Sequence, residues 1–193
     1  MGRKAGVAAE ETKAALLEAA AKVFARRGYD GASISEITSE AGLTSGAIYA
    51  HYASKAELFN ATLEVYAERD LDQLLQGGAD VVDAILSIGS SIDHRESTEA
   101  SLLISAIVAA RNDPEVAKLL VSGMAEREVM FRGLVNAAQE VGSLDPDLTA
   151  EAISRFCLMV SMGSLVVEAL GIEPVGHADW TKLIARLVAT IRS

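Results

Sequence analysis

The chain has 193 residues, of which half are hydrophobic and only three are proline, and it carries a formal net charge of −10. This length and composition suit a packed, mostly helical protein with one small and one larger domain. A single cysteine, Cys157, excludes an intramolecular disulfide. The apolar runs are short and interrupted by serine, so we expect no membrane-spanning segment and a cytoplasmic protein.

The first predicted helix covers residues 11–27. Leu17, Ala21 and Phe24 recur on one stripe of that helix. Gly28 follows at the place of a helix C-cap glycine, so the helix is expected to end there.

A second, short helix is predicted after Ser33. Ser33 and Glu36 form an S-x-x-E capping box, in which the hydroxyl and the carboxylate each accept a backbone N–H at the helix start. Ile34 and Ile37 give this helix one buried face, and Gly42 supplies the positive φ that ends it.

A third helix is predicted directly after the glycine turn. Thr44 or Ser45 can cap it, and Ile48 is expected to face inward while Tyr49 and His51 point outward. Two short helices around a turn that holds a glycine are typical of a helix-turn-helix, a DNA-reading motif.

The remainder of the chain predicts further helices separated by short breaks. Ser54 with Glu57 repeats the capping box, Asp113 before Pro114 marks another helix start, and Gly142 marks an end. The expected helices cover residues 54–76, 80–92, 98–111, 114–141 and 149–170, with Asp179 capping the last one. No alternating run indicates a sheet, so the predicted fold class is all-α.

Two runs, TKAALLEAAAKVFARRGYDGASISEI and AGLTSGAIYAHYASKAELF, resemble the DNA-binding domain of the TetR family of transcriptional regulators. The most specific elements are FARRGY (24–29), AGLTSGAIYAHY (41–52) and SKAEL (54–58). The resemblance implies an N-terminal three-helix helix-turn-helix DNA-binding domain over residues 1–55. A larger helical ligand-binding and dimerisation domain would then cover residues 56–193.

The resemblance also implies which residues contact DNA, because the recognition helix of such domains lies in the major groove. These residues are Ser33, Thr44, Ser45, Gly46, Ala47, Tyr49, His51, Tyr52 and Lys55. Tyr52 and Lys55 are expected at phosphates; the alternatives are a ring that covers the small core and a surface lysine. The recognition helix has no Arg, Asn or Gln, so we expect modest base discrimination per contact.

The charges are divided unevenly along the chain. Residues 1–55 hold 7 basic and 6 acidic residues, whereas residues 56–193 hold 10 and 21. Because phosphate contact needs cations, only the N-terminal part is expected to touch DNA.

The last two predicted helices carry apolar stripes and small residues. The resemblance implies that they pair with the same helices of a second subunit as a four-helix bundle, and core packing within one chain is the alternative. The residues assigned to this homodimer contact are Phe156, Val160, Gly163, Val167, Trp180, Ile184 and Leu187.

Large aromatic and flexible side chains in the middle helices fit either a ligand cavity or a plain core. Only the resemblance favours a small-molecule effector. The ligand-site residues are Tyr66, Leu103, Ile107, Arg111, Met124, Phe131, Phe156 and Met159. Arg111 is also explained by a surface ion pair, which we favour.

Together these features predict a dimeric repressor that binds a palindromic double-stranded DNA operator and is released by a small molecule. The alternative is a DNA-binding dimer whose larger domain serves dimerisation or a protein partner and takes no effector. An enzyme is not expected, because the chain lacks the G-x-S-x-G, H-E-x-x-H, G-x-G-x-x-G and Walker motifs. The three histidines are too dispersed to predict a metal site, and we expect no cofactor.

Overall fold

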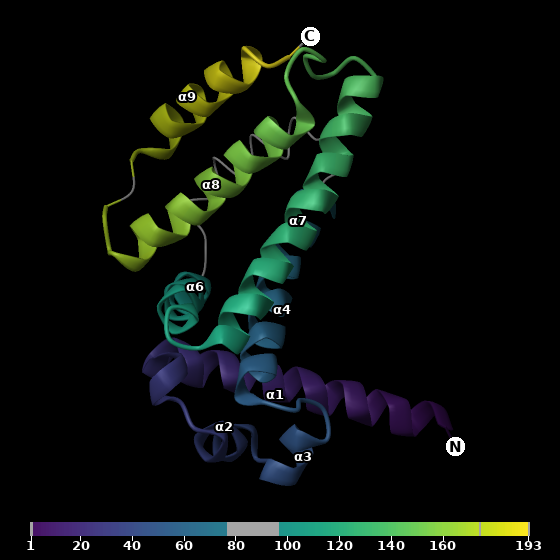
Figure 1. Ribbon diagram of the computed structural model, residues 1–193, viewed down its shortest axis with the longest axis vertical. Helices are drawn as coiled ribbons and strands as arrows, with labels where there is room; N and C mark the ends of the chain where they lie inside the picture. Colours follow the sequence, from purple (N-terminus) through teal and green to yellow (C-terminus); the bar gives the residue numbers. More distant parts are fainter. Residues whose placement is uncertain (1, 77–96, 174, 193) are drawn as a thin grey trace. The chain divides into compact units, whose positions relative to one another are not determined.

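The computed structural model describes residues 2–76, 97–173 and 175–192, and these residues form helices and no strand (Figure 1). The helices are α1 (Gly2–Gly31), α2 (Ile34–Ala41), α3 (Ser45–Tyr49), α4 (Lys55–Gln76), α6 (Ser97–Ala110), α7 (Pro114–Glu140), α8 (Ala150–Ala169) and α9 (His177–Ala189). The predicted all-α class is confirmed. The helix predicted over 80–92 lies outside the described residues.

The packing of the chain defines two compact units. The first comprises Met1–Ala67 with Ser101–Val121, and the second comprises Glu68–Ala100 with Ser122–Ser193. From the sequence we predicted a domain boundary after residue 55. The first unit of the structure is larger, because it also includes the start of α4, most of α6 and the first turns of α7.

The first unit is built around an aromatic core. Its fully buried side chains include Phe24, Ile37 and Ile48, which the sequence predicted, together with Leu58 and Phe59. The Phe59 ring lies 4.6 Å from that of Phe24 and 5.1 Å from that of Tyr29, which are ordinary packing distances for aromatic pairs. Leu102 and Ala106 of α6 complete this core, so it joins segments far apart in sequence.

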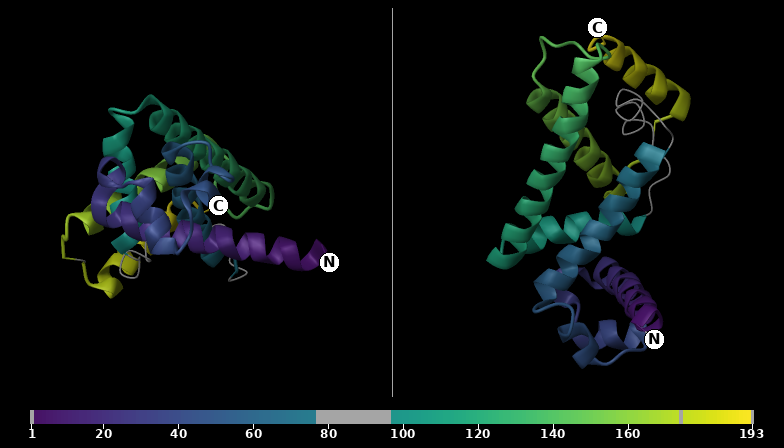
Figure 2. Two further views of the ribbon diagram at one scale, coloured as in Figure 1. Left: turned by 90° about the horizontal axis from the view of Figure 1, so that it is seen from below. Right: turned by 90° about the vertical axis from the view of Figure 1, so that its right-hand side faces the viewer.

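Two glycines shape the helix-turn-helix end of the first unit. Gly28 adopts φ 70° and ψ 171° inside α1, and Gly42 adopts φ 65° at the C-cap of α2. Both conformations favour glycine, because a Cβ disfavours the left-handed region. Gly28 was predicted to end the helix; the helix is interrupted there and continues to Gly31. Gly42 lies in the turn between α2 and α3. These two helices lie side by side below α1 in Figure 1 and in the right-hand view of Figure 2.

The second unit packs α7, α8 and α9 around a smaller core. Its buried side chains include Phe131, Val135, Leu144, Ile153, Cys157, Ile184 and Val188. Helix α8 begins where the sequence predicted, and Thr149 caps it, since its hydroxyl accepts the N–H of Ala152 at 3.2 Å. The cap predicted at Asp179 is wrong: α9 begins after Gly176, and Asp179 lies in its first turn.

Helix α8 is unusually apolar. Of the described helices it alone has the length and apolar composition to cross a membrane, although the sequence was expected to contain no such run. Its residues Ile153 and Cys157 are buried in the core of the second unit, so one side of the helix belongs to that core. Only 33% of its apolar stretch is buried within the chain, however, which leaves an apolar face uncovered.

Candidate nucleic-acid interface

Helix α3 is a five-residue element held by one buried anchor. Ile48 is fully buried in the core of the first unit, while Tyr49 leaves 57% of its surface exposed. Thr44, Gly46 and His51 are exposed as well, and Ser45 and Ala47 belong to the backbone of α3. Thr44 occupies the N-cap position, but its side chain makes no capping hydrogen bond. The arrangement therefore presents hydroxyl, phenol and imidazole groups outward on a fixed backbone.

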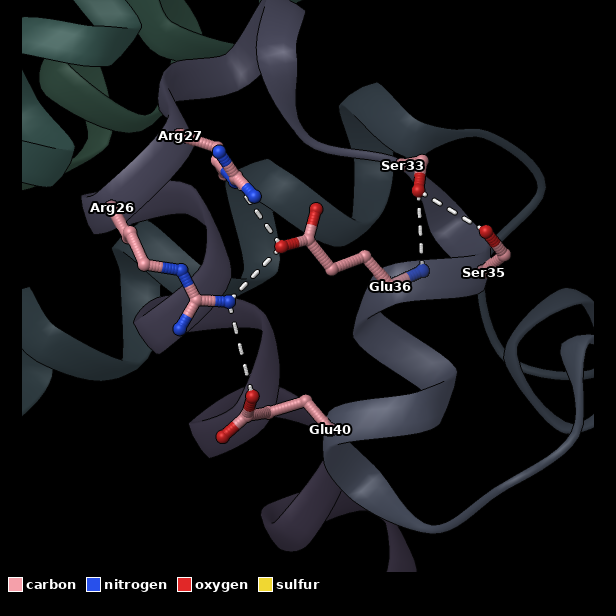
Figure 3. Close-up of polar contacts among 6 residues, drawn as sticks. All are labelled: Arg26, Arg27, Ser33, Ser35, Glu36 and Glu40. Atoms are coloured by element: carbon pink, nitrogen blue, oxygen red, sulfur yellow. Dashed lines mark hydrogen bonds and ion pairs between the residues drawn. The ribbon is translucent and has the colours of Figure 1, made fainter.

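Ser33 caps α2, but the predicted capping box forms only on one side (Figure 3). The Ser33 hydroxyl accepts the backbone N–H of Glu36 at 3.2 Å and lies 3.2 Å from the Ser35 hydroxyl. Instead of returning to the N-cap, the Glu36 carboxylate accepts hydrogen bonds from Arg26 at 3.0 Å and Arg27 at 3.2 Å. The box fails because two guanidinium groups compete for its carboxylate.

Arg26, Arg27, Glu36 and Glu40 thus form an ion-pair cluster that links α1 to α2 (Figure 3). The hydrogen bonds from Arg26 and then Arg27 lower the pKa of the Glu36 carboxyl. This cluster could not be predicted, because residues nine and ten positions apart on different helices leave no local pattern in the sequence. Two of the basic residues counted toward DNA binding are thereby paired with acids.

Tyr52 lies in the core of the first unit. Only 7% of its surface is exposed, and it packs with the buried residues around Ile48. The ring therefore covers the small core, the role that was given as the alternative to a phosphate contact.

Lys55 is the first residue of α4, and its side chain reaches to the end of α1. Its ammonium donates to the backbone carbonyls of Tyr29 at 2.9 Å and Ala32 at 3.2 Å. It also lies 4.4 Å from the centre of the Tyr29 ring, within range of a cation–π interaction. The predicted phosphate ligand is thus engaged with its own chain.

Tyr29 joins this region to α6 and α7. The break in α1 at Gly28 leaves the Tyr29 N–H outside the helix ladder, and it donates to the Ser105 hydroxyl at 2.7 Å. The Tyr29 phenol donates to the carboxylate of Asp113 at 2.9 Å. Burial, and then this hydrogen bond, raise the pKa of Tyr29. Apart from the FARRGY motif, no sequence pattern indicates this role of Tyr29.

The predicted ligand-site residues divide between the two units. Tyr66, Leu103, Ile107 and Arg111 belong to the first unit, and Met124, Phe131, Phe156 and Met159 belong to the second. Leu103 and Phe131 are buried, whereas Ile107, Arg111, Phe156 and Met159 are exposed.

The predicted dimer residues fall into two groups. Phe156, Gly163 and Val167 of α8 and Leu187 of α9 are exposed, and Val160 and Trp180 are half-buried. Ile184 is instead buried in the core of the second unit, because α9 turns that side toward α7 and α8 of its own chain. Its side chain is therefore not part of the exposed surface that Phe156, Val167 and Leu187 offer.

Two further features bear on chemistry. Burial raises the pKa of the Cys157 thiol to about 12, so it remains protonated near neutral pH. Among the residues that the structure describes, no three His, Cys, Asp or Glu side chains are grouped so as to hold a metal ion.

The comparisons with known proteins agree with this geometry. The family model described as "Bacterial regulatory proteins, tetR family" matches residues 16–72. The HTH-type transcriptional regulator UidR of Escherichia coli K12 is 25% identical over 159 residues, which is 81% of each chain. The HTH-type transcriptional repressor KstR2 of Mycobacterium tuberculosis H37Rv is 29% identical over 151 residues, 73% of each chain.

The fold is also found among solved structures. A Rhodococcus sp. protein assigned to the TetR family of transcriptional regulators superposes with a TM-score of 0.83 and 18% identity, over 95% of this chain and all of that one. A helix-turn-helix in an all-α chain, with these relatives, defines a DNA-binding transcriptional regulator and not an enzyme. The chain belongs to the TetR family.

Proposed function

We propose that this regulator is a cytoplasmic homodimeric repressor that binds a palindromic double-stranded DNA operator and leaves it when a small molecule binds. The observation that carries the proposal concerns α3. Its Ile48 side chain is fully buried in the core of the first unit, whereas the neighbouring Tyr49 is exposed. Because Ile48 anchors α3 and polar side chains face outward, the helix can enter a major groove without a change of conformation. The word "repressor" in the name of KstR2 supports the direction of regulation.

The proposed contact residues are those that the family resemblance implies, and Thr44, Gly46, Tyr49 and His51 among them are exposed. The groove contacts are Thr44, Ser45, Gly46, Ala47, Tyr49 and His51, and Ser33 meets a flanking phosphate. Threonine and alanine methyls can meet thymine methyls, and hydroxyls are good phosphate donors. One helix without arginine binds weakly, so two copies on two half-sites are needed for useful affinity.

The proposed dimer contact is the uncovered apolar side of α8 and α9. On α8, Phe156 and Met159 are 55% and 65% exposed, and Gly163 and Val167 continue the same side toward its end. On α9, Leu183 and Leu187 are also about half-exposed. Large exposed side chains on two adjacent helices favour association through this face.

The proposed effector site lies among the apolar side chains of the middle helices. Four of the predicted residues belong to each of the two units. The alternative function, a DNA-binding dimer that takes no metabolite, is retained, since the exposed apolar side of α8 equally suits a protein partner.

Selection of bound fragments from random DNA with the full-length chain tests the proposal. We expect enrichment of an inverted repeat with half-sites one helical turn or more apart. Sedimentation at the same concentration should give a dimer, and a Tyr49→Ala variant serves as the binding-defective control. A monomer, or a chain that enriches no sequence at low salt, would overturn the proposal. A small-molecule screen by thermal shift and operator release then separates the repressor from the alternative.

A further inference from the structure

Tyr29 uses each of its three polar groups to contact a different part of the first unit. Its N–H donates to the Ser105 hydroxyl of α6 at 2.7 Å, and its phenol donates to the Asp113 carboxylate, just before α7, at 2.9 Å. Its carbonyl accepts a hydrogen bond from the Lys55 ammonium of α4 at 2.9 Å. The ring is buried and lies 5.1 Å from that of Phe59. Tyr29 is therefore held from α6, from the start of α7 and from the core.

The Lys55 ammonium depends on Tyr29 for two of its contacts. Besides donating to the Tyr29 carbonyl, it lies 4.4 Å from the centre of the Tyr29 ring, within the range of a cation–π interaction. It also donates to the Ala32 carbonyl at 3.2 Å. A lysine side chain has a flexible four-carbon stem. A carbonyl and a ring that are themselves fixed restrict its ammonium to one place.

In this position the ammonium can still bind an anion. A lysine ammonium has three N–H donors, and the two carbonyls use two of them. Lys55 is only half-buried. The Ala32 carbonyl directly precedes Ser33, whose exposed side chain is the proposed contact to a flanking phosphate. The third N–H of Lys55 can therefore donate to a phosphate at the start of α2.

We propose that Tyr29 is a positioning residue for DNA binding: it holds the Lys55 ammonium where it meets a phosphate, and Ser105 and Asp113 keep Tyr29 in place. An unrestrained lysine loses the rotational freedom of its side chain when it binds a phosphate, whereas a restrained one has already lost it on folding. The inference deepens the proposed function and rests on it for the affinity readout. The placement of Lys55 by Tyr29 can be tested without DNA.

Operator affinity and its salt dependence test this role in a double-mutant cycle. Lys55→Met should lower the slope of log K against log salt by about 0.9 for each half-site, because a phosphate contact is lost. Tyr29→Leu removes the ring and the phenol. It should weaken operator binding by about threefold to tenfold per half-site, which is the cost of ordering one long side chain. In a Lys55→Met background the same substitution should have no further effect on operator affinity.

A second variant loosens Tyr29 without changing the core. Ser105→Ala removes the acceptor of the Tyr29 N–H and leaves the ring intact, so it should weaken operator binding only when Lys55 is present. This variant decides the question if Tyr29→Leu does not fold.

Two controls separate positioning from general effects. Val135→Ala shortens a fully buried side chain of the second unit, so it should lower the melting temperature without weakening operator binding well below that temperature. Lys118→Met removes an exposed charge of α7 and should leave the salt slope unchanged.

Nuclear magnetic resonance of the DNA-free protein measures the placement of the ammonium directly. Protons that lie over the face of an aromatic ring resonate upfield of their ordinary position. The ε-methylene signals of Lys55 should therefore lie upfield in the wild type, because the Tyr29 ring is close to the ammonium. In Tyr29→Leu they should return to ordinary lysine values, and in Ser105→Ala the displacement should be smaller than in the wild type.

Three results would each overturn the inference. They are an unchanged salt slope for Lys55→Met, a Tyr29→Leu or Ser105→Ala effect that persists in the Lys55→Met background, and ordinary ε-methylene shifts in the wild type. A wild type that binds no DNA refutes the proposed function, whereas the ε-methylene shifts still decide whether Tyr29 holds Lys55.

Discussion

The Tyr29 phenol and the Asp113 carboxylate, 84 residues apart in the chain, are joined by a hydrogen bond of 2.9 Å. The other carboxylate oxygen of Asp113 accepts the N–H groups of Glu115 at 2.9 Å and Val116 at 3.3 Å. One side chain therefore both caps α7, as the sequence predicted, and holds the end of α1. The start of α7 and the DNA-binding helices are fixed to each other within the first unit.

Removing the hydroxyl group of Tyr29 should destabilise the protein, although the aromatic ring stays in the core. For Tyr29→Phe we expect the free energy of unfolding to fall by about 1 to 2 kcal/mol, because the variant loses a hydrogen bond to a charged acceptor. Urea denaturation followed by circular dichroism measures the change. Tyr49→Phe, which alters an exposed phenol, is the control. Equal stability of wild type and Tyr29→Phe would show that the hydrogen bond contributes nothing.

The same carboxylate gives a pH dependence with a definite sign. The hydrogen bond from Tyr29, followed by that from the Val116 N–H, lowers the pKa of Asp113 below its ordinary value of 3.8. A lowered folded-state pKa stabilises the protein above that ordinary value, and the contribution is lost as the pH falls through the folded-state pKa. Asp113→Asn should therefore lose less stability than the wild type between about pH 5 and pH 2. Parallel acid titration curves for the two proteins would contradict the assignment.

Freeing the arginine pair of the ion-pair cluster should strengthen electrostatic attraction to DNA. Glu36→Gln removes the carboxylate that holds Arg26 and Arg27, both of which are more than half exposed. We expect higher affinity for any duplex at low salt, with a difference that shrinks as salt is added. Fluorescence anisotropy with labelled operator and unrelated duplexes measures this. Glu173→Gln, outside the first unit, should change nothing. A gain confined to the operator would exclude a purely electrostatic cause.

Tyr49 should contribute to sequence preference rather than to the fold. With 57% of its surface exposed, Tyr49→Ala should leave melting nearly unchanged and weaken binding to the preferred site by about 1 to 3 kcal/mol, with a smaller loss on other sequences. Ile48→Ala, at the buried anchor, should instead cost about 2 to 5 kcal/mol of stability. An equal loss on all sequences for Tyr49→Ala would make it a backbone contact.

A charge on the apolar side of α8 should prevent dimerisation. Phe156 is exposed and lies outside the core of its own chain, so Phe156→Glu is expected to yield a folded monomer, because a buried unpaired carboxylate is costly at an interface. Analytical ultracentrifugation measures the assembly. Val141→Glu, at an exposed site beyond the end of α7, is the matched control. A dimer that survives Phe156→Glu places the contact elsewhere.

Local hydrogen-bonding signals predicted much of the fold. The caps at Ser33, Asp113 and Thr149 and the helix ends at Gly42 and Gly142 were readable because each depends on residues within one turn. The apolar spacing likewise indicated the buried face that holds Phe24, Ile37 and Ile48.

Side-chain partners that come from distant segments could not be predicted in this way. The Glu36 carboxylate fitted a local box but meets two arginines of α1. Lys55 was expected at a phosphate, because no local pattern indicates the two carbonyls to which it donates. Ile184 lies on the same stripe as the exposed Leu187, and only the packing of α9 on its own chain tells them apart.

The participation of residues 101–121 in the first unit has a practical consequence for protein engineering. Leu102, Ala106 and Val116 fill the same core as Phe24 and Phe59. A fragment cut after residue 67 would expose that apolar surface to water and should aggregate. A chimaera that transfers operator specificity to a related regulator must therefore include residues 1–67 and residues 101–121. Otherwise the packing between these two segments must be restored by mutation for the transferred unit to fold.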